Sequence, residues 1–163
     1  MRLHHQVVEI NLARNDISTL GAAALSQLLR LHSSVKGLNL HENSINDIGA
    51  AALARMLVSN SCLHALRLSG NLLTDQGALS LVEGVLRNTA LQAVTLEREP
   101  VMVHELKGAG VGGRLDLSMR GYGRLSAVLI AKLIEGWAPD VDKLVLDRCG
   151  CTHTLLAVTH TLC

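Results

Sequence analysis

Residues 35–62 read VKGLNLHENSINDIGAAALARMLVSNSC, and the stretches of equal length before and after them repeat the same pattern. The pattern consists of Leu38, Leu40, Asn43, Ile45, Gly49, Leu53 and Leu57. Its counterparts are Ile10, Leu12, Asn15, Ile17, Gly21, Leu25 and Leu29 on one side, and Leu66, Leu68, Asn71, Leu73, Gly77, Leu81 and Val85 on the other. A fixed period that is held three times without an insertion indicates a solenoid of stacked repeats.

Each repeat combines a strand pattern with a helix pattern. In residues 38–45, LNLHENSI, apolar and polar residues alternate, which predicts a strand with one buried face. Asp47 then stands at or near a helix N-cap, and the apolar residues of 53–57 form an inward stripe. Asn60 and Asn88 follow near the predicted helix ends, where asparagine tolerates the left-handed conformation.

The asparagines Asn15, Asn43 and Asn71 stand at one level of the predicted solenoid, at the turn after each strand. A side-chain amide carries two donors and an acceptor, so a stack of amides can satisfy turn backbone groups that would otherwise be buried and unpaired. We therefore predict a structural role for these three residues.

The pattern L-x-x-L-x-L-x-x-N, with one strand and one helix in every repeat, resembles the leucine-rich repeat family. The repeat length is similar to that of its ribonuclease-inhibitor-like subfamily, whose pattern allows a cysteine at the Asn position, where this chain has Cys149. The resemblance implies an α/β fold: a right-handed β-α superhelix with a curved parallel sheet inside and helices outside. It also implies that partners dock on the concave side of the sheet.

The repeat pattern divides the chain into three parts. We predict a single leucine-rich repeat domain over residues 1–163, with regular repeats in 7–90, an irregular repeat in 91–114 and further repeats in 115–163. Residues 100–114 are expected to form a crossover without a helix, either a hairpin or an irregular loop, because the segment contains a proline and ends rich in glycine. Bare apolar edges at Val7 and in the last predicted helix lead us to expect a fragment of a larger protein, or self-association through these ends.

Composition excludes several classes of function. The formal net charge of +1 predicts no general attraction to nucleic acid or to an anionic membrane. No apolar run is long enough to span a bilayer. The four cysteines are few and unevenly spaced, which is unlike a secreted disulfide framework, so we expect a cytoplasmic or nuclear protein.

Motifs that could carry chemistry are weak. Residues 108–113, GAGVGG, fit a dinucleotide fingerprint, but they lead into a strand pattern and not into a helix. A C-terminal group of cysteine and histidine residues could hold zinc, although its spacing lacks the usual C-x2-C knuckle. That group comprises Cys149, Cys151, His153, His160 and Cys163. No nucleophile is paired with a base at a recognisable spacing, so we predict neither an enzyme nor a cofactor.

The most informative candidate site is the polar face of the predicted strands. By alternation, this concave face carries Glu9, Asn11, Arg14, Asn39, His41, Glu42, Arg67, Ser69, Thr95, Glu97, Arg98, Asp116, Lys143 and Asp147. Charges of both signs and hydrogen-bonding groups suit a specific protein partner, although any one of these residues could be a plain solvated position.

The sequence therefore predicts a scaffold that binds a protein through the concave face of a leucine-rich repeat solenoid. Two alternatives stay open from the resemblance. The chain could regulate a small GTPase, as Ran-type GTPase-activating proteins with this repeat style do, with Arg14 or Arg98 touching the nucleotide-loaded partner. It could also be part of an innate immune receptor.

Overall fold

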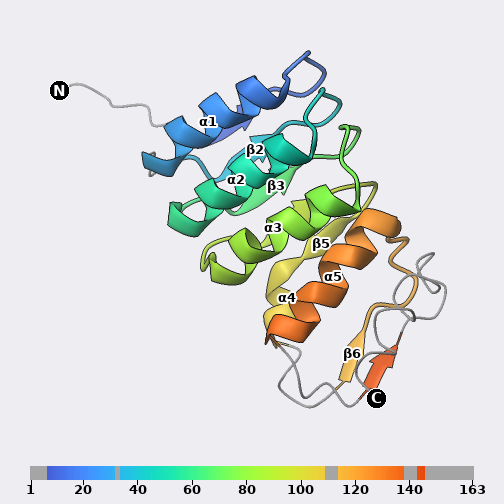
Figure 1. Cartoon of the computed structure of the whole chain (residues 1–163). Helices are drawn as coiled ribbons and strands as arrows, with labels where there is room; N and C mark the ends of the chain where they lie inside the picture. Colours follow the sequence, from blue (N-terminus) through green and yellow to red (C-terminus); the bar gives the residue numbers. More distant parts are fainter. Residues whose placement is uncertain (1–6, 32–33, 109–113, 138–142, 146–163) are drawn as a thin grey trace.

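The computed structural model describes residues 7–31, 34–108, 114–137 and 143–145 (Figure 1). Its strands are β1 Glu9–Asn11, β2 Gly37–Asn39, β3 Ala65–Arg67, β4 Ala93–Thr95, β5 Pro100–Met102, β6 Arg114–Asp116 and β7 Lys143–Val145. Its helices are α1 Thr19–Leu31, α2 Asp47–Ser59, α3 Asp75–Arg87, α4 Val103–Gly108 and α5 Arg124–Trp137.

Strands β1 to β4 form a parallel sheet in chain order, and each pair is joined through a helix. Ile10 pairs with Leu38, Leu38 with Leu66, and Leu66 with Val94, so each step of the register equals one sequence repeat. In Figure 1, α1, α2, α3 and α5 stack in one layer that covers the sheet. This arrangement confirms the predicted α/β solenoid of alternating parallel strands and helices.

The core lies between the sheet and the helix layer, and it is aliphatic in the regular repeats, whereas the later part of the chain adds the buried Tyr122 and the partly buried Trp137. Leu38 and Leu66 on the strands face Leu53 and Leu81 on the helices, and all four are almost completely buried. Burying a leucine side chain contributes about 1.5–3 kcal/mol. Because each repeat supplies the same inward positions, the stack continues from one repeat to the next without large aromatic anchors.

The sheet changes after β4, in the repeat where the sequence pattern fails. β5 turns back and pairs antiparallel with β4, with Val101 opposite Val94. The expectation of a hairpin in this segment agrees with the structure, but the expectation that it lacks a helix is wrong. The short helix α4 directly follows β5. Its residues Val103 and Leu106 are both buried against the core, and this packing stabilises the helix.

The sheet is also divided beyond this point, because β6 and β7 form a separate two-stranded sheet. The helix layer nevertheless continues, because α5 packs against α3 as the next helix of the stack (Figure 1). Arg124 at the start of α5 donates to the Asp75 carboxylate at the start of α3, with Nε 3.1 Å from Oδ2. Lys107 of α4 lies 5.0 Å from the centre of the Trp137 ring, and burial lowers the pKa of this lysine.

Both ends of the regular helices are held by polar side chains. The N-caps of α2 and α3 are Asn46 and Thr74, so Asp47 is the first residue of α2 and not its cap. At the other end, Asn60 and Asn88 adopt extended backbone angles, so neither residue uses the left-handed conformation that asparagine tolerates. Their amides instead bridge successive repeats, as Asn60 Nδ2 donates to the Leu29 carbonyl oxygen at 2.7 Å.

Among the described residues, no helix combines the length and the apolar character that crossing a membrane requires.

Candidate functional site

A hollow of 540 Å³ lies on the face of the sheet that points away from the helices, over β2, β3 and β4. We call it the concave hollow. It is lined by Asn39, His41, Ala65, Leu66, Arg67, Ser69, Ala93, Thr95, Arg98, Pro100 and Met102. The polar members of this set, Asn39, His41, Arg67, Ser69, Thr95 and Arg98, are all positions that the strand alternation predicted for the concave face.

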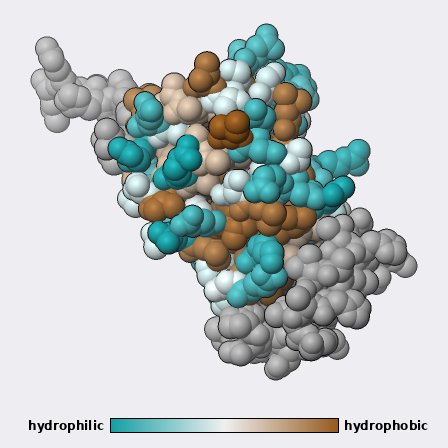
Figure 2. All heavy atoms as spheres, viewed as in Figure 1, coloured by the Kyte–Doolittle hydropathy of each residue, from teal (hydrophilic) through white to brown (hydrophobic). Residues whose placement is uncertain are grey.

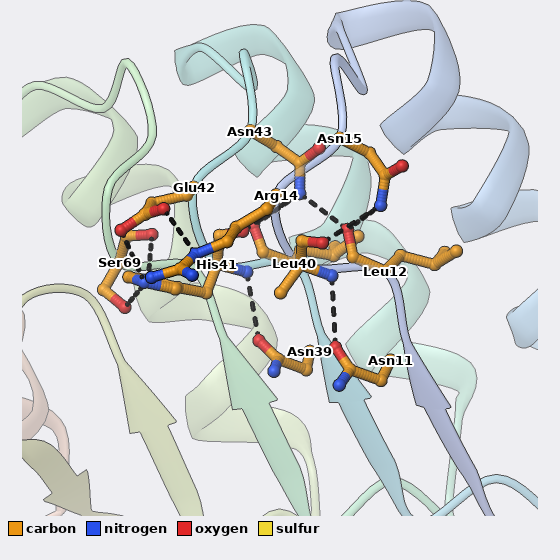
Figure 3. Close-up of polar contacts among 11 residues, drawn as sticks. Asn11, Leu12, Arg14, Asn15, Asn39, Leu40, His41, Glu42, Asn43 and Ser69 are labelled. Atoms are coloured by element: carbon orange, nitrogen blue, oxygen red, sulfur yellow. Dashed lines mark hydrogen bonds and ion pairs between the residues drawn. The ribbon is translucent and has the colours of Figure 1, made fainter.

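Some of the predicted concave-face residues stabilise the ends of their own strands (Figure 3). The Oδ1 atom of Asn11 accepts a hydrogen bond from the Ala13 backbone N–H, and Oδ1 of Asn39 accepts from the His41 N–H, both at 3.1 Å. Asp116 at the end of β6 accepts in the same way from the Ser118 N–H at 3.0 Å. These side chains are already engaged with the local backbone, as is usual for Asn and Asp in turns.

The residues after β1 and β2 form a polar network across the strands (Figure 3). Arg14 Nε donates to Glu42 Oε2 at 2.8 Å, and both residues adopt positive φ angles of 59° and 50°. His41 contacts Glu42 through Nε2 at 3.0 Å and Ser69 Oγ through Nδ1 at 2.8 Å. Because the Arg14 and Glu42 side chains are largely exposed, this ion pair orients the loop more than it stabilises the fold.

Asn43 and Asn71, in the turns after β2 and β3, form hydrogen bonds with backbone atoms of two successive repeats. Asn43 is 8% exposed, and its Nδ2 donates to the carbonyl oxygens of Leu12 at 2.9 Å and Leu40 at 3.0 Å (Figure 3). Its Oδ1 accepts from the Ile17 N–H at 3.0 Å. Asn71 makes the same contacts one repeat later, whereas Asn15 in the first repeat is exposed. Asn43 and Asn71 therefore hold the turns that follow β1, β2 and β3 in place.

Arg67 and Arg98 differ from the other concave-face arginine. Both side chains line the hollow and both residues are exposed. Within the part of the chain that the structure describes, neither guanidinium makes an ion pair, whereas Arg14, Arg87, Arg120 and Arg124 all do. These two arginines are therefore the charged groups of the hollow that are available to a partner.

Glu97 does not occupy the concave position that alternation predicted. Its Oε2 accepts a hydrogen bond at 3.1 Å from the backbone N–H of Ser126, in the first turn of α5. A helix N-terminus presents unpaired N–H groups and partial positive charge, so it attracts a carboxylate. Gly123 permits this approach, because a Cβ there would overlap the Glu97 carboxylate. Glu97 thus connects the end of β4 to α5 and does not line the hollow.

Several predicted residues lie away from the hollow or beyond the described part of the chain. Glu9 lies across Gly37, since a Cβ at Gly37 would be 3.2 Å from the Glu9 Cγ atom. Lys143 stands on β7, in the separate two-stranded sheet. Asp147 and Cys149 fall outside the described residues, as does the whole cysteine and histidine group considered for zinc. Within the described residues, no three His, Cys, Asp or Glu side chains come together as metal ligands.

Sequence reasoning missed one wall of the hollow. Pro100 and Met102 line it from β5, and Ala65 and Ala93 line it from the neighbouring strands β3 and β4. The extended pattern at residues 100–103 was the available signal for β5, but alternation alone could not show that this segment returns to the concave side. The small side chains of Ala65 and Ala93 leave open space on this face of the sheet beside the larger polar side chains, such as Arg67.

The comparisons with known proteins agree with this architecture. A family model described as "Leucine Rich repeat" matches residues 5–26 and 59–82. No curated protein matches the chain significantly. A solved structure described as "Leiomodin-1 Actin-Binding Site 2 (ABS2)" is 21% identical, covers 95% of this chain and 78% of its own, and has a TM-score of 0.59. At this identity the likeness concerns the fold alone. The chain therefore contains leucine-rich repeats, and its fold is that of a leucine-rich repeat solenoid.

Proposed function

We propose that the chain is a protein-interaction module that binds a protein partner in the concave hollow. The observation that carries this proposal is the hollow itself, where two arginines without ion pairs to the described residues flank small and apolar groups. Interfaces of this kind draw most of their binding energy from a few central residues, and arginine is enriched among them. The fold supports the proposal, since stacked repeats form extended surfaces that are suited to binding.

The nature of the partner is a further part of the proposal. The similar solved structure is described as an actin-binding site, so actin is a reasonable first candidate for this chain. Because the similarity concerns the fold alone, actin is one candidate, and it is tested together with the mixture of proteins in a whole cell extract. A role in the cytoplasm or nucleus would be consistent with such partners.

A photo-crosslinking amino acid placed on each face tests the proposal. We expect crosslinks to a partner protein from position Thr95, which lines the concave hollow, because a docked chain would lie within reach of it. The matched control is position Arg55, an exposed residue on the helix side of the solenoid. Crosslinked products are identified by mass spectrometry, with purified actin and whole cell extract as separate samples. Equal crosslinking from both positions, or crosslinking from Arg55 alone, would contradict concave docking.

A further inference from the structure

The concave hollow has a charge bias that the whole chain does not share. The formal net charge of the chain is +1, yet Arg67, Arg98 and His41 line the hollow and no Asp or Glu of the described residues does. The hollow therefore presents two permanent positive charges in a small area. Such a local concentration of like charge attracts the opposite charge during encounter and favours a partner with matching negative groups.

The bias arises because the nearby carboxylates are engaged elsewhere. Glu97, which alternation places in one row with His41 and Ser69, accepts the Ser126 N–H at the start of α5. Glu42 is held by Arg14 on one oxygen and by His41 on the other. Among the described residues, neither carboxylate neutralises Arg67 or Arg98, so the charge of these guanidinium groups remains available.

The groups around the two arginines define the chemistry of a ligand. A guanidinium presents five N–H donors in a planar arrangement that matches the two oxygens of a carboxylate. Arg67 is on β3 and Arg98 follows β4, so they come from strands that lie about 5 Å apart. Met102 and Pro100 form an apolar wall beside them. Carboxylates that alternate with an aliphatic side chain would satisfy both features.

We propose that the concave hollow recognises an acidic peptide segment, in which Asp or Glu side chains pair with Arg67 and Arg98 and an aliphatic side chain lies against Met102. This inference rests on the proposed function, since it names the chemistry of the partner at the same site. A nucleic acid fits less well: its evenly spaced phosphates require a long basic track. Here the first strand contributes Glu9 instead, and Glu42 stands at the rim of the hollow.

The test measures binding of labelled peptides by fluorescence anisotropy at low salt. The probe is a fluorescein-labelled peptide of repeating Glu-Leu-Asp units, and its uncharged counterpart is built of Gln-Leu-Asn units. We expect the acidic peptide to bind at least about tenfold more tightly, because bidentate charged hydrogen bonds are the stronger ones. Arg67→Gln and Arg98→Gln should each weaken binding about fivefold, and the double variant should lose most of it. Arg55→Gln, on the helix side, should leave binding unchanged.

Three results would overturn the inference. They are equal binding of the two peptides, full binding by the double variant, or tighter binding of a single-stranded oligothymidine than of the acidic peptide. Crosslinking at Thr95, repeated with the double variant, separates this inference from the proposed function. If the partner still crosslinks at Thr95 when both arginines are replaced, concave docking stands and acidic recognition is wrong. If Thr95 captures no protein, the docking function itself is wrong.

Discussion

Replacing Asn88 by alanine is expected to lower the free energy of unfolding by about 4 kcal/mol, because several buried backbone groups would lose their partners at once. Asn88 is 2% exposed, and its side chain bonds only to backbone atoms among the described residues. Its Nδ2 donates to the carbonyl oxygens of Leu57 at 2.7 Å and Asn60 at 2.6 Å. Its Oδ1 accepts from the N–H groups of Ala90 and Leu91 at 2.9 and 2.6 Å. Each buried group left unpaired costs about 1–3 kcal/mol.

Urea denaturation followed by circular dichroism measures this loss as a lower midpoint with an unchanged slope. The matched control is Asn15→Ala, because Asn15 also donates to backbone carbonyl oxygens but is exposed to water. We expect that control to lose less than about 1 kcal/mol. Asn88→Asp should be as unstable as Asn88→Ala, since a carboxylate oxygen would face the Leu57 carbonyl. If Asn88→Ala and Asn15→Ala lost the same stability, the proposed bridging role of Asn88 would be wrong.

Gly84→Ala is expected to lower the free energy of unfolding by about 2 kcal/mol through overpacking, although alanine is the better helix former. A Cβ at Gly84 of α3 would lie 2.5 Å from the carbonyl oxygen of Ala54 and 2.9 Å from its Cα. These are backbone atoms of α2, so neither a rotamer change nor a small side-chain shift relieves the overlap. Overpacking costs about 1–3 kcal/mol or more, whereas the gain in helix propensity is about 1 kcal/mol.

Gly108→Ala is the matched control, because Gly108 is also helical but an added Cβ would meet nothing within 4 Å. We expect it to be neutral or slightly stabilising, so thermal unfolding should separate the two variants by several degrees. Equal melting temperatures would show that α2 and α3 are not as close as the structure indicates. Because the helix layer holds the sheet in register, the Gly84 variant should also unfold at lower urea concentration.

The sequence was sufficient to predict the architecture of the first repeats, because inward leucines such as Leu38 and Leu66 recur at a constant spacing. It was not sufficient beyond β4. Whether Pro100 begins a loop or a returning strand depends on its pairing with Thr95, which is a contact between segments and not a local pattern. The addition of α5 to the helix layer involves packing against α3 and a hydrogen bond between Glu97 and Ser126, which lie 29 residues apart in the sequence.

The concave face was predictable as a set of positions but not as a site. Alternation places Asn39, Arg67 and Glu97 on one face of the sheet, yet only the structure distinguishes their roles. Asn39 holds its own turn, Glu97 binds the amino end of α5, and Arg67 is left without an ion pair to a described residue. Likewise, the position of Asn88 near a helix end was evident, but its bridging contacts require the stacking of two repeats.

Arginine side-chain NMR spectroscopy tests concave docking most directly, because the Nε–Hε group of each arginine reports on its own surroundings. The protein, with a mass of 17.4 kDa, is titrated with the partner identified by crosslinking, or with the segment of it that binds. Docking in the concave hollow predicts that the Arg67 and Arg98 resonances shift while those of Arg55 and Arg87 on the helix side stay in place. Shifts of Arg55 and Arg87, with Arg67 and Arg98 unchanged, would contradict it.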